Sequence, residues 1–199
     1  VAFMPNPSDT SMECEDNGVK KKFARDLCFA GNPREGDPRW DLLAEVLPKL
    51  DGRINYEIFG GKNGIWGAKY EQVLANSKMS LNLNRKEGDK WYSSDRIAHL
   101  MGYGILTFQS SRNQMERFFT DKETVYFDDA GDLVDKICYY NEHDDERAAI
   151  ASAGRRKYHQ IFNGARVLKF MVETMTGDKY SEPYEWAEEV YRKAYKFMV

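Results

Sequence analysis

Three loops of the sequence carry residue types that suit the binding of a phosphate-bearing ligand. The first holds Gly31 and Arg34, the second holds Lys62 among glycines, and the third runs from Ser93 to Arg96. Lysine and arginine side chains donate charge-assisted hydrogen bonds to phosphate oxygens, and the start of a helix adds free backbone N–H groups. None of the loops is a GxGxxG or P-loop motif, so their convergence indicates the chemistry better than any one of them.

The third loop leads into a helix and then into a buried strand. Serine is a preferred N-cap residue, so the hydroxyl of Ser94 or Ser93 is expected to accept a backbone N–H where the helix begins. Glycines end this helix, and residues 104–108 form an apolar run typical of a strand covered on both faces. Arg96 in the first turn opposes the helix dipole. A bound anion would explain this arginine, and a solvated surface arginine is the other interpretation.

Strand and helix patterns alternate along the rest of the chain. The strand patterns lie at residues 23–30, 54–59, 79–83, 104–108 and 124–127. The helical patterns lie at residues 38–50, 68–76, 95–101, 133–138, 144–161 and 164–171. This alternation predicts an α/β fold with a Rossmann-like parallel sheet and helices on both faces. The loops after the strands then open on one edge of the sheet, where such folds bind their ligands.

Composition excludes several classes of function. The chain has 199 residues, with 29 basic and 32 acidic side chains and a net charge of −3, so nothing attracts it generally to nucleic acid or anionic membranes. No apolar run approaches the roughly 18 residues of a membrane span, and no signal peptide is visible. The three cysteines lack the spacing of a zinc site or a disulfide framework. We therefore expect a cytoplasmic protein without a transmembrane segment that does not bind nucleic acid.

An ordered series of segments resembles the CgeB-like glycosyltransferases, which have the GT-B fold. The longest segment, RIAHLMGYGILT at residues 96–107, is similar to the helix-to-strand segment of that family, and FAG at residues 29–31 resembles its opening strand and turn. The other matching segments follow in the same order at residues 118–119, 126–129, 133–137, 145–155 and 158–167. The resemblance covers residues 26–173. Each segment alone is common, and the order in which they follow one another makes the resemblance specific.

The resemblance implies that this chain is the C-terminal domain of a glycosyltransferase, which binds a nucleoside diphosphate sugar as donor. It divides the chain into an interdomain linker remnant at 1–22, a Rossmann-like domain at 23–180 and an amphipathic helix at 181–199. That last helix is expected to cross to a missing N-terminal domain, and the start at Val1 fits a piece of a longer protein. The missing domain would hold the acceptor site and the catalytic base, so the fragment alone is expected to be inactive.

The same resemblance implies transfer without a metal or another cofactor, with protein cations and a helix N-terminus stabilising the leaving diphosphate. Hydrogen bonds to charged groups contribute about 1.5–3 kcal/mol each, against about 0.3–1 kcal/mol for a helix dipole, so Arg34 or Lys62 should dominate. Arg39 is expected on the surface of the first helix. The complete set of expected donor-binding residues is Gly31, Arg34, Lys62, Ser93, Ser94, Asp95, Arg96 and His99.

His99 departs from the family pattern, in which a glutamate at this position holds the ribose hydroxyls of the donor. A neutral histidine can give or accept one hydrogen bond through each ring nitrogen, but it cannot accept two hydroxyls as a carboxylate can. His99 is therefore either a partial ribose contact or a partly buried structural histidine. Asp128 and Asp129 lie at a turn before a helix and are expected to cap it. Three aromatic residues near the loops would either stack on the base or pack in the core: Trp66, Trp91 and Tyr92.

Two other classes of function stay open. One is a non-catalytic nucleotide- or sugar-binding module of the same fold, which His99 and the missing partner domain both favour. The other is a response-regulator-like α/β interaction domain, which fits the sheet pattern but lacks an acidic cluster after the first strand. Donor binding would separate the first two classes from the third, and sugar transfer by the longer protein would separate an enzyme from a binding module.

Overall fold

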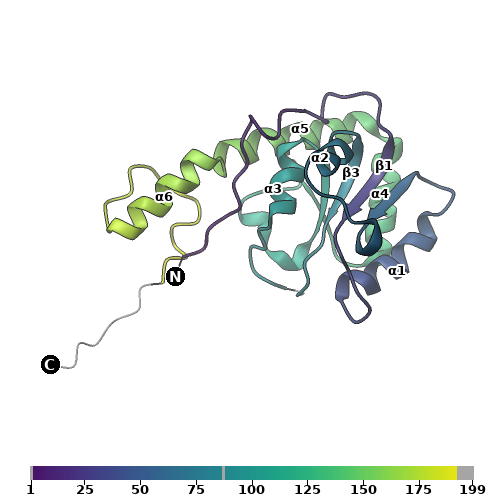
Figure 1. Cartoon of the computed structure of the whole chain (residues 1–199), viewed down its shortest axis with the longest axis horizontal. Coiled ribbons are helices and arrows are strands. Elements are labelled where there is room, and N and C mark those ends of the chain that lie inside the picture. The colour runs from purple at the N-terminus through teal and green to yellow at the C-terminus, as the bar shows by residue number, and fades with distance from the viewer. Residues whose placement is uncertain (1, 87, 192–199) are drawn as a thin grey trace.

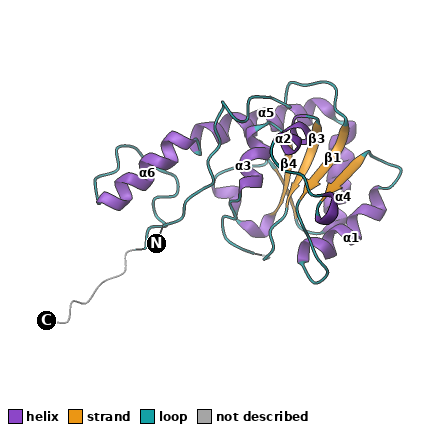
Figure 2. Cartoon of the chain, in the orientation of Figure 1, coloured by secondary structure: helices purple, strands orange, loops and turns teal. Residues whose placement is uncertain are grey.

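The chain folds around a five-stranded parallel sheet with helices on both faces (Figure 1, Figure 2). The structure is a computed structural model that describes residues 2–86 and 88–191. The strands are β1 (Arg25–Ala30), β2 (Tyr56–Phe59), β3 (Ser77–Asn82), β4 (Leu106–Ser110) and β5 (Val125–Phe127). Their order is β2-β1-β3-β4-β5, and each neighbouring pair is parallel. The predicted α/β, Rossmann-like class is confirmed.

The helices form two layers over this sheet. Within the described ranges they are α1 (Pro38–Leu50), α2 (Ala68–Ala75), α3 (Asp95–Gly102), α4 (Ala130–Glu142), α5 (Asp144–Ile161) and α6 (Gly164–Thr176). Apolar residues of α1 and α4 form one core with the sheet, while α2 and α3 contribute to a second core. Figure 1 shows α6 extending away from the sheet. No helix of the described residues is long and apolar enough to cross a membrane.

Helix starts follow the expected capping chemistry at three places. The side chain of Asp37 accepts the N–H of Arg39, with Pro38 at the first helical position of α1. Asp129 accepts an N–H at the start of α4, and Asn163 does the same for α6. The expectation that Asp129 caps a helix is therefore confirmed. Side-chain oxygens of this kind satisfy backbone donors that the helix itself leaves unpaired.

The segment before β1 is irregular, as a linker remnant would be, but it packs tightly on the domain. Asn17 is buried, and its side-chain nitrogen donates to the carbonyls of Leu74 at 2.8 Å and Ser77 at 2.9 Å. Its backbone N–H donates to Tyr103. The buried guanidinium of Arg147 in α5 donates to the carbonyl of Asn17. This segment is thus an integral part of the folded unit, and its origin as an interdomain linker stays a prediction.

The prediction of a C-terminal helix at residues 181–199 is wrong for residues 181–191, the part of it that the structure describes. Residues 181–191 form turns and a short bridge in place of a helix, and residues 192–199 lie outside the described residues. The physical reason lies in the aromatic residues of this tail. Tyr184 and Trp186 are buried against Phe162 and Phe170, so the tail covers an aromatic cluster of its own chain.

Asn17→Ala should lower the free energy of unfolding by about 1–3 kcal/mol, because two buried carbonyls lose their donor and regain no water. Chemical denaturation monitored by circular dichroism measures this change. Asn63→Ala, at an exposed position in the short helix Gly61–Asn63, is the matched control and should change stability by less than about 0.5 kcal/mol. Equal stability of the two variants would mean that the N-terminal segment does not anchor through Asn17.

Candidate functional site

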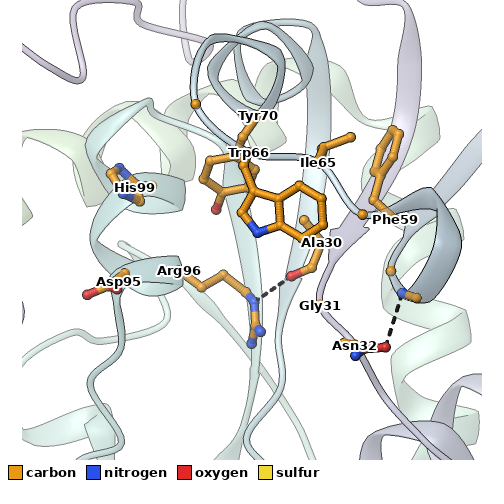
Figure 3. Close-up of a pocket in the computed structure, with 14 residues that line it drawn as sticks. Ala30, Gly31, Asn32, Phe59, Ile65, Trp66, Tyr70, Asp95, Arg96 and His99 are labelled. Carbon is orange, nitrogen blue, oxygen red and sulfur yellow. Dashed lines mark hydrogen bonds between the residues drawn. The ribbon is translucent and has the colours of Figure 1, made fainter.

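A pocket of about 370 Å³ opens at the carboxyl ends of β1 and β2, beside α2 and α3 (Figure 3). β1 and β3 are neighbours in the sheet, and the chain winds away from them in opposite directions. A crevice forms where the strand order reverses in this way, and open α/β sheets bind ligands there. The lining comes from the end of β1, the loop at residues 60–67, and side chains of α2 and α3.

Glycines let the two loops at the floor of this pocket touch. A Cβ atom on Gly60 would lie 1.9 Å from the carbonyl oxygen of Gly31, far inside van der Waals contact. The N–H of Gly31 donates to Phe59 at 2.8 Å, and the N–H of Gly61 donates to the side-chain oxygen of Asn32 at 3.0 Å. The floor is therefore a close backbone contact, which no larger residue at position 60 would permit.

Arg96 lines the pocket, and two of its guanidinium nitrogens donate to backbone carbonyls of the protein. Its Nε donates to the carbonyl of Ala30 at 3.1 Å, and Nη1 donates to the carbonyl of Leu83 at 2.6 Å. The guanidinium also lies 4.9 Å from the ring centre of Phe29. The interpretation as a solvated surface arginine is therefore wrong, and the binding of an anion by Arg96 stays a prediction.

His99 lies one turn further along α3 and is paired with an N-terminal residue. Its Nδ1 lies 2.7 Å from a carboxylate oxygen of Glu13, whose side chain is only 2% exposed. This hydrogen bond raises the pKa of His99 above its usual value, although partial burial opposes it. Burial pushes the pKa of Glu13 upward, but hydrogen bonds from His99 and a backbone N–H outweigh it and lower that pKa.

A second hollow of about 230 Å³ adjoins the pocket and shares Asn32 with it. Three arginines and one aspartate line it: Arg34, Arg39, Arg85 and Asp37. Arg39 is 5% exposed and forms an ion pair with Asp37, so the expectation of a surface residue is wrong. The hydrogen bond from Arg39 lowers the pKa of Asp37 to about 2. With that pair neutralised, the hollow keeps a net charge of +2.

The other predicted residues divide between the pocket and its surroundings. Gly31, Asp95, Arg96 and His99 line the pocket, and Arg34 lines the hollow, while Lys62 is exposed and lines neither. The hydroxyl of Ser93 accepts the N–H of Asn6 at 2.8 Å. Ser94 occupies the N-cap position of α3, but its hydroxyl accepts no N–H there. The expected capping by either hydroxyl is therefore wrong.

Among the three aromatic candidates, Trp66 alone lines the pocket. Its side chain is 78% exposed, and Figure 3 shows the indole at the rim near Tyr70. Trp91 is buried in the aromatic cluster, with its ring centre 5.0 Å from that of Phe118. The packing alternative therefore holds for Trp91, and Trp66 stays available to a ligand.

The model of the glycosyl transferase-like family matches residues 34–173, which is more than half of the sequence. The chain belongs to this family. No curated protein matches it. Membership supports transferase chemistry at the level of the family, while the narrower likeness to the CgeB-like enzymes stays a prediction.

Solved structures of several glycosyltransferases share the fold of this chain. Anabaena Alr3699/HepE in complex with UDP and glucose has a TM-score of 0.60 and 13% identity over 80% of this chain and 50% of its own. A glycosyltransferase from Rickettsia africae ESF-5 has a TM-score of 0.64 and 11% identity over 86% and 55% of the two chains. The chain spans about half the length of these structures, so the part that it matches is one half of a GT-B fold.

A third structure has a similar size to this chain. The C-terminal domain of the glycosyl transferase group 1 family protein LpcC from Francisella tularensis has a TM-score of 0.55 and 10% identity. The match covers 82% of this chain and 97% of that domain. Identities this low make each likeness one of fold, so ligands and reactions do not carry over with it.

The residues of the site that were not expected from the sequence include Glu13, Asn32 and Arg85. Arg85 follows β3 as Arg34 follows β1, so the rule that selected Arg34 would also have found it. No sequence pattern indicated Glu13, because it lies 86 residues from His99 in an irregular segment.

Within the described ranges no three His, Cys, Asp or Glu side chains gather as metal ligands. Transfer without a metal and a cytoplasmic location stay predictions.

Arg96→Met should destabilise the fold by about 1–3 kcal/mol, because two carbonyls at the sheet edge lose their donors. Arg34→Met removes the same charge from an exposed side chain and should leave stability within about 0.5 kcal/mol of the unchanged chain. Urea denaturation of the two variants measures the difference. Equal stabilities would contradict the structural role of Arg96.

Proposed function

We propose that the pocket and the arginine hollow together bind a nucleoside diphosphate sugar, and that the chain is the donor-binding half of a glycosyltransferase. The observation that carries this proposal is the junction at Asn32, where a pocket large enough for a nucleoside, in which Asp95 balances Arg96, meets a hollow of net charge +2. The nucleoside would occupy the pocket, and the diphosphate would lie against Arg34 and Arg85.

Charge complementarity supports this orientation. The diphosphate of a nucleotide sugar carries two negative charges, and guanidinium groups bind phosphate oxygens through paired, charge-assisted hydrogen bonds. Arg39 is committed to Asp37, whereas the side chain of Arg34 forms no hydrogen bond or ion pair with another described residue. As the glycosidic bond breaks, negative charge grows on the departing diphosphate, so these contacts strengthen in the transition state and raise the rate.

Family membership and the solved neighbours support the same assignment. HepE structures hold UDP, UDP with glucose, or UDP-glucose, and the LpcC domain is itself a C-terminal domain. A missing N-terminal domain would then contribute the acceptor site and the catalytic base. Protein cations in the hollow would stabilise the leaving group in place of a metal. A non-catalytic binding module of the same fold would bind the same ligand. Measuring sugar transfer by the longer protein separates the two functions, because a binding module would show none.

Calorimetric titration with UDP, GDP and ADP should show saturable binding of one diphosphate. Arg34→Ala and Arg85→Ala should each weaken it about tenfold or more, because each removes a charge-assisted contact worth about 1.5–3 kcal/mol. Lys62→Ala tests the remaining predicted cation, which lies outside the hollow. Arg156→Ala, an exposed arginine of α5, is the matched control and should bind as the unchanged chain does. Binding of no diphosphate, or equal affinity in all variants, would contradict the proposal.

Trp66→Ala should weaken nucleoside diphosphate binding at least fivefold, because stacking of a base on an aromatic ring contributes about 1–3 kcal/mol. Binding to the unchanged chain should also quench indole fluorescence, and this signal should shrink in the variant. Trp40→Ala is the control, since Trp40 is an exposed tryptophan of α1 outside the pocket. An equal loss of the ligand-induced signal in both variants would argue against stacking at Trp66.

A further inference from the structure

Glu13 is a buried carboxylate whose two oxygens are both committed. Oε1 lies 2.7 Å from Nδ1 of His99, and Oε2 accepts the backbone N–H of Asp9 at 2.7 Å. The guanidinium of Arg155 also donates to the backbone carbonyl of Glu13 at 2.9 Å, which fixes the segment from the other side. A buried carboxylate is costly unless a cation pairs with it. Glu13 therefore favours the protonated, charged form of His99.

Pairing with Glu13 determines what His99 can offer to a ligand. The Nδ1 atom is occupied, so Nε2 is the ring atom that remains for a molecule in the pocket that His99 lines. The side chain is 28% exposed, so that ring edge is accessible. A protonated imidazole donates from both nitrogens and accepts from neither. The position therefore presents a hydrogen-bond donor, which is the opposite of what a glutamate would present.

The charged groups around His99 favour the same state. Asp95 lies one turn earlier in α3, and Glu71 of α2 adds a second negative charge, so both raise the pKa of His99. Tyr70 of α2 packs against the imidazole in a T-shaped contact, with 5.7 Å between the ring centres. Arg96, the neighbouring cation in α3, donates from Nε to the carbonyl of Ala30 and from Nη1 to that of Leu83.

We propose that His99 is a specificity-determining residue that donates a hydrogen bond from Nε2 as an imidazolium, and that Glu13 is the positioning residue that orients it. This rests on the proposed nucleotide function. Figure 3 shows His99 and Asn32 on opposite sides of the pocket, so a ligand with its phosphates at the Asn32 side turns its nucleoside toward His99. The acceptor is an oxygen of that nucleoside, either a ribose hydroxyl or a base carbonyl.

Calorimetric titration from pH 6 to pH 9 tests the proposal. The probes are UDP-glucose, GDP-mannose and ADP-glucose, whose diphosphates are esterified at both ends and do not titrate in this range. The pH series uses whichever of them binds. The unchanged chain should lose about tenfold in affinity as the pH rises through the pKa of His99, since the lost hydrogen bond has a charged donor. Glu13→Gln should move this loss to lower pH, and His99→Gln should bind weakly at every pH.

Glu15→Gln is the matched control, because Glu15 is an exposed carboxylate two residues further along the same segment. Its pH profile should follow that of the unchanged chain. Thermal melting checks that each variant is folded. An NMR titration of the imidazole signals, assigned with His99→Gln, reads the pKa of His99 without any ligand and should show a lower value in Glu13→Gln.

The possible outcomes separate the two proposals. Binding that does not vary with pH, or the same pH profile and His99 pKa in Glu13→Gln, would overturn the role of the pair and leave the nucleotide function intact. Binding of none of the three probes at any pH would overturn the nucleotide function and this inference with it. A nucleoside diphosphate that lacks both ribose hydroxyls identifies the acceptor. The acceptor is a ribose hydroxyl if removing the hydroxyls weakens binding as much as His99→Gln does, and if His99→Gln then causes no further loss of affinity. The acceptor is a base oxygen if the two losses of affinity add.

Discussion

Arg96 joins the ends of the two central strands, and the site is arranged around that connection. Where neighbouring parallel strands end, their last carbonyls have no partner in the sheet and must find other donors. The guanidinium of Arg96 supplies donors to Ala30, the last residue of β1, and to Leu83, which follows β3. Because Arg96 lies in the first turn of α3, these bonds fix the start of that helix over the point where strand order reverses. The positions of Asp95 and His99 in the pocket follow from it.

Using Arg96 in this way divides the site into two electrostatic regions. Nε and Nη1 of Arg96 donate to backbone carbonyls and cannot also bind a phosphate, and the carboxylate of Asp95 in the same lining balances the guanidinium charge. The positive charge lies beyond Asn32, where Arg34 and Arg85 remain after Arg39 is neutralised by Asp37. A ligand with one neutral end and one anionic end fits this arrangement better than a uniformly charged one.

The sequence predicted most of the fold because local patterns decide it. Alternating apolar runs and helical periodicity identified the parallel sheet, and Asp37, Asp129 and Asn163 cap helices as their residue types suggest. The site was predicted only in part. Chain order placed Gly31 and His99 at the correct edge, but it could not show that Arg96 is occupied by carbonyls or that Arg39 is buried. These outcomes depend on contacts between loops that are distant in sequence.

The same limit explains the C-terminal tail and Glu13. The tail had helical periodicity, yet burying Tyr184 and Trp186 against α6 stabilises a different conformation. Propensity is a weak influence, and packing of large aromatic rings overrides it. Glu13 lies in a segment whose composition is that of a linker, and its importance arises only from the 2.7 Å contact with His99.

The Glu13–His99 pair links the stability of the N-terminal segment to protonation. Since the pKa of His99 is raised in the folded chain, its contribution to stability is complete below about pH 6.5 and is lost as the pH rises through the raised value. The pKa of Glu13 is lowered, so its contribution is present above about pH 4.3 and is lost as the pH falls through its folded value. The pair is strongest between these limits. A ligand that accepts a hydrogen bond from protonated His99 must, by reciprocity, stabilise the contact with Glu13 by the same free energy. An exposed ion pair would be too weak to carry this coupling, and the burial of Glu13 is what gives it strength.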